Sequence, residues 1–336
     1  MNNELEIMGK GIVHYVDSEF IYASYKNQIF KSEDDGGSWQ LVCKIPISFW
    51  QSVFGFFILL RRIFRLQIFH VLPISNGVLI VGYKKIVKHV FQVNESQNTI
   101  SSIVGSRPLT ICQDCNGVIY YGEYRSNKER APVNIYASKD EGASWQIVYS
   151  MSGVRHIHGV FNDAYTDSIW VTTGDSDAES ALWVTKNGFK SLEKVVFGSQ
   201  QTRAVQLLFS KDYIYFGSDT PLEQNYLYRF HREALEVKRL QKVEGSIFFG
   251  VKIREQLCFS TVVEPSFVNT SKNIVIWQSV DGKKWKQIAV FKKDFLPKKI
   301  FQYGQVFFPI IKSVSDYLWF TPFATNKHNR IMRMKL

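Results

Sequence analysis

The chain has 336 residues, and its 41 lysines and arginines outnumber its 30 acidic residues to give a formal net charge of +11. Because 45% of the residues are apolar and 15% are aromatic, the chain can bury a full core, which excludes a disordered, collagen-like or disulfide-stapled protein. The four cysteines are too few and too scattered for a disulfide framework, and Cys112 and Cys115 lack the second pair that typifies a zinc site.

The amino-terminal segment MNNELEIMGK contains no apolar run of the roughly 7–15 residues that an export signal needs. The longest apolar run of the chain, at residues 53–60, is shorter than the roughly 18 residues that would span a bilayer. We therefore expect a cytoplasmic protein without a membrane-crossing segment.

A turn motif recurs along the chain. Residues 32–39 and 138–145 both fit the pattern S-x-D-x-G-x-x-W, residues 279–285 fit a shortened form, and residues 185–192 fit a decayed one. The Asp or Asn positions, 34, 140, 187 and 281, are separated by about two, one and two periods of 47 residues. Seven such periods nearly exhaust the chain, and a repeat of this length is typical of radially repeated folds. The motif resembles the Asp-box, or BNR repeat, of sialidase-like β-propellers.

Each period also contains a strand-like run of β-branched and aromatic residues. Regular strands without a long helical pattern predict an all-β fold, a seven-bladed β-propeller that forms a single domain over residues 1–336, with six blades as the alternative. Periods without the turn motif still show a following strand, at residues 86–93, 226–230 and 330–334. The seven runs are at residues 21–24, 78–82, 118–122, 168–173, 213–217, 256–260 and 317–321.

A helical insertion is expected around residues 48–66, because the segment from 49 to 69 is longer than the other blade connections need. One broad side of this helix would carry aromatic and aliphatic residues, and Arg61, Arg62 and Arg65 would lie toward the other end. That pattern resembles an interfacial amphipathic helix, which predicts peripheral contact with the inner face of the membrane. The alternative is a helix folded over the propeller or into a dimer contact.

The third blade carries the more specific resemblance. Residues 107–145 look like the opening of a sialidase, with Arg107 and Pro108 at the start and Glu123 and Arg125 at the end of an apolar strand. The match departs in lacking an Ile between Arg107 and Pro108. The resemblance implies that Arg107 binds a substrate carboxylate, with Glu123 as its buried partner, and a guanidinium suits that task because its planar fork pairs bidentately with a carboxylate.

The catalytic residues of that family transfer poorly. Sialidases place an acid/base Asp in the loop that follows, where residues 126–132 offer only Glu129. Tyr303 lies in the chain region where the resemblance implies a nucleophilic tyrosine, although a packing aromatic is the alternative interpretation. Because many Asp-box propellers are not sialidases, the resemblance bears on fold more than on activity.

Polar residues recur at blade entries and in the loops between the second and third strands. In a propeller these two kinds of segment should lie on the same face. His156 and His158 would lie on one face of a strand, because side chains alternate with period two. We expect these groups to converge on the mouth of a central channel, and a solvated charged rim is the alternative. The candidates are Arg107, Glu123, Tyr124, Arg125, Arg155, His156, His158, Asp175, Asp177, Gln201, Arg203 and Asp219.

Three of these candidates, Arg107, Arg155 and Arg203, are arginines at blade entries, and in a chain of positive net charge they favour an anionic ligand. An acidic sugar or an anionic surface glycan fits best. A glycoside hydrolase would draw its acid and nucleophile from Glu123, Glu129, Asp175, Asp219 and Tyr303. A polysaccharide lyase acting on a uronate would use His156, His158 or Tyr124 as base and acid. No cofactor is predicted, although a divalent metal at His156 and His158 stays open, with no third ligand identifiable.

Two other functions remain open. If the insertion contacts the membrane, the protein could be a glycosyltransferase-type enzyme that acts on a membrane-linked glycan. Independently of membrane contact, it could be a non-catalytic propeller that binds an anionic glycan or a protein. Nucleic-acid binding is disfavoured, because the aromatic residues follow core periodicity and the basic residues are dispersed.

Overall fold

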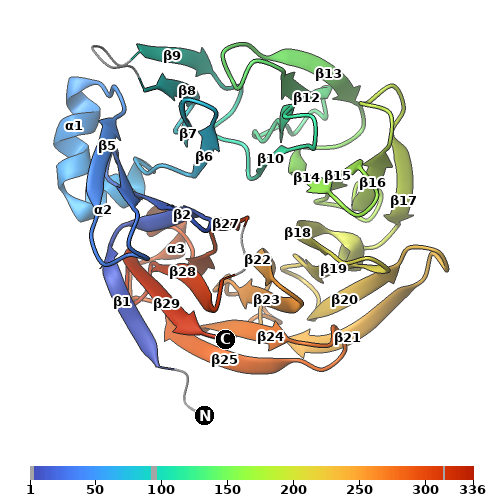
Figure 1. The fold of residues 1–336 in the computed structure, drawn as a ribbon. Coiled ribbons are helices and arrows are strands. Elements are labelled where there is room, and N and C mark those ends of the chain that lie inside the picture. The colour runs from blue at the N-terminus through green and yellow to red at the C-terminus, as the bar shows by residue number, and fades with distance from the viewer. Residues whose placement is uncertain (1–3, 92–96, 313–314) are drawn as a thin grey trace. The chain divides into compact units, whose positions relative to one another are not determined.

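The computed structural model describes residues 4–91, 97–312 and 315–336 and is all-β, with its strands gathered into seven sheets (Figure 1). This confirms the predicted seven-bladed β-propeller, and the described residues fall into two compact units. The first unit runs to Pro73 and includes Ile80–Tyr83 and Phe249–Leu336, and the second comprises Ile74–Leu79 and Lys84–Phe248.

Three four-stranded sheets lie in the second unit, each built from strands in chain order with antiparallel neighbours. The first sheet contains β10 (Ile111–Gln113), β11 (Ile119–Gly122), β12 (Val133–Ser138) and β13 (Gln146–Met151). The second contains β14 (Ile157–Asp163), β15 (Ser168–Thr173), β16 (Ala181–Thr185) and β17 (Glu193–Phe197). The third contains β18 (Ala204–Phe209), β19 (Tyr213–Ser218), β20 (Asn225–His231) and β21 (Val237–Val243).

Two further four-stranded sheets also have their strands in chain order. One consists of β6 (His70–Ile74), β7 (Gly77–Gly82), β8 (Lys85–Val90) and β9 (Gln97–Ser102), and another of β22 (Ile247–Ile253), β23 (Gln256–Thr261), β24 (Asn273–Ser279) and β25 (Lys286–Lys292). A five-stranded sheet joins β2 (Ile12–Val16), β3 (Ile21–Tyr25), β4 (Gln28–Ser32) and β5 (Gln40–Lys44) to β27 (Ile310–Ile311), which runs parallel to β2.

The last sheet combines both ends of the described chain. Its order is β26 (Gln305–Phe307), β28 (Tyr317–Phe323), β29 (Arg330–Lys335) and β1 (Leu5–Lys10). Strands β1 and β29 are antiparallel, with Leu5 opposite Met334 and Lys10 opposite Arg330. The first strand of the sequence thus completes the sheet that the last strands begin.

The seven predicted strand runs are β3, β7, β11, β15, β19, β23 and β28. Each is the second strand of its sheet, except that in the five-stranded sheet the added β27 lies outside β2 and makes β3 the third. In β7 and β15 every residue is buried, which explains why these runs are continuously apolar or small rather than alternating. The sequence shows these central strands most clearly because they are covered on both faces.

The turns after β4 and β12 are held by their own side chains. The carboxylate of Asp34 accepts hydrogen bonds from the backbone N–H and the hydroxyl of Ser38, at 2.8 and 2.7 Å, and Asp140 accepts the same pair from Ser144. The indole of Trp39 donates to the backbone carbonyl of Met8 in β1. These groups are engaged in the scaffold, so they are not candidates for chemistry.

The insertion contains two short helices, α1 (Phe49–Phe56) and α2 (Ile58–Ile63), where a single helix was expected. The chain is extended at Phe57, with φ −86° and ψ 124°, so the helical hydrogen bonding is interrupted there. Arg61 and Arg62 are buried, which corrects the prediction that they line an exposed polar flank. Two further short helical segments are η1 (Gln200–Thr202) and α3 (Lys298–Phe301), and no helix among the described residues is long and apolar enough to cross a membrane.

Candidate functional site

Two buried histidines meet at the start of β14. His156 precedes the strand and His158 lies within it, and a register shift between Ile157 and Gly159 marks a bulge between them. The two Nε2 atoms lie 3.0 Å apart. The two imidazoles therefore lie side by side, although His156 precedes the strand in which it was expected. A bulge is a common means of re-aiming side chains near functional sites.

Asp175 faces this pair from the loop between β15 and β16. Its carboxylate oxygens lie 3.4 Å from Nε2 of His156 and 3.8 Å from Nε2 of His158. The φ of Asp175 is +96°, a conformation that costs free energy in a residue with a side chain and that recurs at functional sites. At the preceding Gly174, a Cβ atom would come within 2.6 Å of both His158 and Arg203, so this close approach requires glycine.

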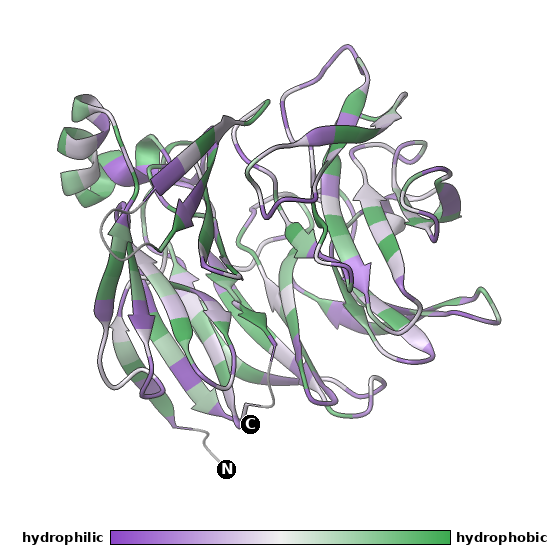
Figure 2. Cartoon of the chain, turned by 45° about the horizontal axis from the view of Figure 1, so that its top comes forward, coloured by the Kyte–Doolittle hydropathy of each residue, from purple (hydrophilic) through white to green (hydrophobic). Residues whose placement is uncertain are grey.

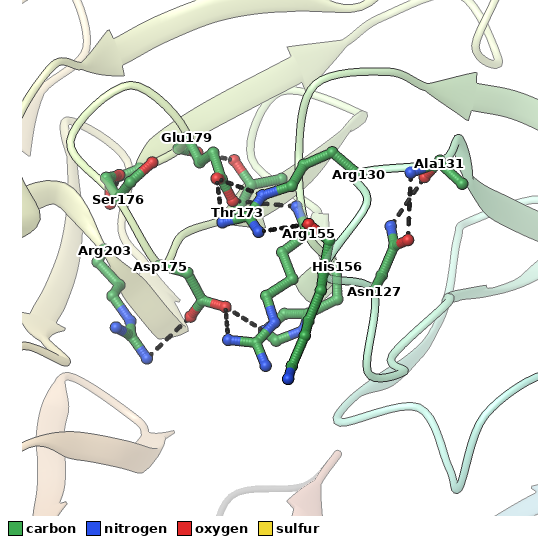
Figure 3. Close-up of polar contacts among 12 residues, drawn as sticks. Asn127, Arg130, Ala131, Arg155, His156, Thr173, Asp175, Ser176, Glu179 and Arg203 are labelled. Carbon is green, nitrogen blue, oxygen red and sulfur yellow. Dashed lines mark hydrogen bonds and ion pairs between the residues drawn. The ribbon is translucent and has the colours of Figure 1, made fainter.

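Two arginines bind the same carboxylate, as Figure 3 shows. Nη1 of Arg155 lies 3.1 Å from one oxygen of Asp175, and Nη2 of Arg203 lies 3.1 Å from the other. Nε of Arg203 also lies 3.1 Å from the carboxylate of Asp219. Two consecutive sheets of the second unit thus contribute to one cluster of charges, because Arg155 precedes β14 and Asp175 follows β15 in one sheet, and Arg203 precedes β18 in the next.

Tyr124 covers the histidines from the loop after β11. Its ring centroid lies 4.3 Å from that of His156 and 6.5 Å from that of His158. Burial raises the pKa of Tyr124, with opposing influences from the charges of Arg107 and Asp219. The phenol therefore keeps its proton at neutral pH.

The protonation of the pair follows from its hydrogen bonds. Nδ1 of His156 lies 3.3 Å from the carbonyl oxygen of Arg125, so the N–H is assigned to that nitrogen and the lone pair to Nε2. Burial, together with the charge of His158, lowers the pKa of His156 to about 4, so the imidazole is neutral at neutral pH. Nδ1 of His158 is buried, and no described residue forms a hydrogen bond with it.

Asp175 stays ionised. Burial alone would raise its pKa, but the imidazoles of His158 and His156 and the guanidinium of Arg203 hold the pKa well below its usual range. The carboxylate can accept hydrogen bonds and neutralise positive charge, but it cannot donate a proton near neutral pH.

Glu179 is a member of the site that the sequence prediction missed. It is buried, accepts a hydrogen bond from the backbone N–H of Arg155 at 3.0 Å, and forms an ion pair with Arg130 at 2.9 Å (Figure 3). The loop GDSDAES contains three acidic residues, of which the prediction took Asp175 and Asp177. Sequence alone cannot tell which acidic residue of a loop turns back toward the preceding strand.

Within the described ranges, a divalent cation has one candidate position. The ligand atoms of His156, His158 and Asp175 all lie within 4.8 Å of one another, so Asp175 would supply the third ligand that the sequence left unidentified. However, each oxygen of Asp175 already faces a guanidinium nitrogen at 3.1 Å. A cation would have to share its only carboxylate in this group with two positive charges, which disfavours tight binding.

Several predicted residues have other contacts. Glu123 accepts hydrogen bonds from Arg125 and from the backbone N–H of Asn134, at 3.0 and 2.8 Å, so it holds the loop after β11. Its pairing with Arg107, which the resemblance implies, stays a prediction. Gln201 lies in η1 rather than in a strand and binds Glu223 and the hydroxyl of Tyr228.

The hydrolase set also includes Glu129 and Tyr303. Glu129 is exposed, and Tyr303 belongs to the first unit, where the ammonium of Lys298 lies 5.7 Å from its ring centroid.

No protein-family model matches the chain, and no curated protein matches its sequence. Among solved structures, a chain of the mitotic checkpoint complex matches over 100% of this chain and 94% of its own length, at 7% identity and a TM-score of 0.59. U3-55K matches over 99% and 98%, at 10% identity and 0.58. A protein from Bacteroides uniformis assigned as a 6-phosphogluconolactonase matches over 82% and 87%, at 10% identity and 0.52. At such identities these likenesses show the fold alone.

Proposed function

We propose that the protein is a carbohydrate-active enzyme that acts on an acidic sugar, at the cluster formed by Tyr124, Arg155, His156, His158, Asp175 and Arg203. The observation that carries this proposal is the neutral His156 imidazole beside two guanidinium groups that converge on one carboxylate. A neutral base next to anion-binding groups is the combination needed to remove a proton from a carbon next to a substrate carboxylate.

Arg155 is the group best suited to meet the substrate. Its side chain is 36% exposed, against 17% for Arg203, and its Nε is buried without a partner among the described residues. A guanidinium has five N–H donors, so Arg155 can bind a uronate carboxylate while it retains one contact with Asp175. The net charge of +11 would favour the approach of an anionic glycan.

Elimination fits the protonation states of these residues. Nε2 of His156 would first give up the hydrogen bond that it accepts from His158. It would then take the proton from the carbon next to the carboxylate, and the electron pair of that C–H bond would form a carbon–carbon double bond. The glycosidic C–O bond would break at the same time, and the leaving oxygen would take the phenolic proton of Tyr124. The charge that develops on the carboxylate during this step would be stabilised by Arg155.

Sialidase-like hydrolysis is the second candidate, supported by the resemblance of residues 107–145. It needs a carboxylic acid that stays protonated near neutral pH, or a nucleophile paired with one. Asp175 is held ionised, and Asp219 is bound by Arg203. These contacts favour elimination over hydrolysis at this cluster.

The experiment is to incubate the protein with a panel of uronate and nonulosonate glycans. Elimination would yield an unsaturated product with new ultraviolet absorbance, whereas hydrolysis would yield new reducing ends without it. His156→Ala and Arg155→Ala should each abolish turnover, and the exposed Arg330→Ala should not. If the wild type binds a glycan but turns over no substrate of the panel, and both variants lose that binding, the proposed enzymatic activity would be contradicted. The result would support a non-catalytic glycan-binding propeller.

A further inference from the structure

The helices α1 and α2 present an unusually apolar outer surface. The aromatic ridge consists of the exposed large apolar residues of this segment, and hydrophobic residues run along both helices in Figure 2. Phe49 is 74% exposed, Trp50 66% and Phe56 69%. A contiguous exposed patch of this kind typically marks an interaction site. The ridge comprises Phe49, Trp50, Val53, Phe56, Phe57, Ile58, Leu59, Ile63 and Phe64.

The ridge is attached to the first unit by two buried arginines. Arg62 donates two hydrogen bonds to the carbonyl oxygen of Phe301, at 3.1 and 2.6 Å, and pairs with Asp294 at 2.6 Å. Arg61 donates to the carbonyl oxygen of Gly55, which ties α2 back to α1. Since the polar side of α2 is used for this attachment, the apolar side faces outward in a defined orientation.

Basic residues lie at the margin of the aromatic ridge. Residues 36–94 contain no Asp or Glu but seven Lys and Arg, and both helices lie within this segment. Nζ of Lys26 lies 4.6 Å from the ring centroid of Phe56, at the margin of the ridge. On α3, which packs against α2, Lys299 is exposed. Arg65 is exposed directly after α2.

We propose that the aromatic ridge and its basic margin dock onto the surface of an anionic lipid bilayer. Trp and Phe side chains partition into the interfacial region of a bilayer, and nearby Lys and Arg side chains are attracted to anionic headgroups. A second copy of this chain is disfavoured as the occupant, because a symmetric contact would bring two acid-free, positively charged segments together. Of the three arginines that the sequence assigned to this helix, Arg61 and Arg62 serve as internal anchors. Arg65 stays exposed, and together with Lys26 and Lys299 it would contact the lipid.

The test is flotation of the full-length protein with vesicles of phosphatidylcholine, with or without phosphatidylglycerol. The wild type should bind the vesicles that contain phosphatidylglycerol more strongly, and raising the salt concentration should weaken that binding. Combined replacement of Phe49, Trp50, Phe56 and Phe57 by serine should lower the partition coefficient at least about tenfold. Because these side chains are exposed, the variant should fold, which circular dichroism would verify. Vesicle binding requires no turnover, so the result is independent of the proposed chemistry.

A matched control replaces exposed apolar residues of the second unit, with Phe197→Ser and Leu222→Ser, and should bind like the wild type. Lys26→Glu combined with Lys299→Glu should weaken binding only to the anionic vesicles. Absence of wild-type binding, or equal binding by the serine variant, would overturn the proposal. A third result would also overturn the proposal: the wild type does not float with vesicles, and light scattering shows a wild-type dimer that the serine substitutions dissociate. The ridge would then be an interface between copies of the chain.

Discussion

His156 and His158 face each other through their Nε2 atoms, 3.0 Å apart, in a buried position. Because His156 donates its Nδ1–H to the carbonyl of Arg125, its Nε2 can only accept, and His158 supplies the proton between the two rings. A buried imidazole with an accepting nitrogen next to bound guanidinium groups is set up to receive a proton rather than to give one. The predictions below follow from this arrangement.

Protein stability should fall when the pH decreases from about 6.5 toward 4. The pKa of His156 is lowered to about 4 from its ordinary 6.5, so in this range the unfolded chain takes up a proton that the folded chain excludes. Full stability is therefore present above pH 6.5 and is lost on acidification, by up to about 3 kcal/mol for this group. Urea unfolding of the wild type and of His156→Gln across this range checks the prediction, since the variant should lose part of the pH dependence. An unchanged slope would contradict it.

Turnover should persist to a lower pH than an ordinary histidine allows. If His156 is the base, the acidic limb of the rate profile should lie near its lowered pKa of about 4 rather than near 6.5. The measurement is the pH dependence of kcat/KM on the best uronate substrate, corrected for unfolding at acidic pH. An acidic limb near pH 6.5 would assign the base to another group.

Replacement of Asp175 by Asn should both destabilise the protein and abolish activity. The carboxylate is 10% exposed and lies between Arg155 and Arg203, so the variant leaves two guanidinium groups without their shared counter-charge. We expect a loss of about 3 kcal/mol in the free energy of unfolding, measured with urea. The exposed Asp212→Asn should change it by less than about 0.5 kcal/mol. Comparable effects of the two substitutions would show that the ion pairs contribute little.

The purified protein should not depend on a divalent cation. Each oxygen of Asp175 faces an arginine nitrogen at 3.1 Å, which leaves a cation in competition with two fixed positive charges. Elemental analysis should find no stoichiometric zinc or manganese, and a chelator should change neither the melting temperature nor turnover. A metal bound by the wild type and lost in His158→Ala would reverse this assignment.

Two glycine-to-alanine substitutions should differ in their effects on turnover and on stability. At Gly174 a Cβ atom would come within 2.6 Å of His158 and Arg203, so Gly174→Ala should lower turnover at least about tenfold. At Gly55 in α1 no atom lies within 4 Å of the added Cβ, so Gly55→Ala should stabilise the protein by about 0.5–1 kcal/mol and leave turnover unchanged. Thermal unfolding and substrate kinetics of both variants check this pair.

The sequence by itself determined the repeating architecture. Its second strands appear as continuous runs of apolar and small residues because they are buried on both faces, as in β7 and β15, and burial of that kind leaves a strong local pattern. The period of the turn motif then sets the number of blades. The sequence also placed His156 and His158 together, by alternation along a strand, although His156 precedes β14 and a bulge at His158 interrupts that alternation.

Only the tertiary structure decided which charges meet. Asp175 pairs with arginines 20 and 28 positions away, and Glu179 rather than Asp177 supports the backbone of Arg155. Likewise, Arg61 and Arg62 were expected to be exposed, but they are buried as anchors of the helices. A long flexible side chain carries no periodic pattern that shows its direction, so its partner is set by which loops the packed sheets bring within a few ångströms of one another.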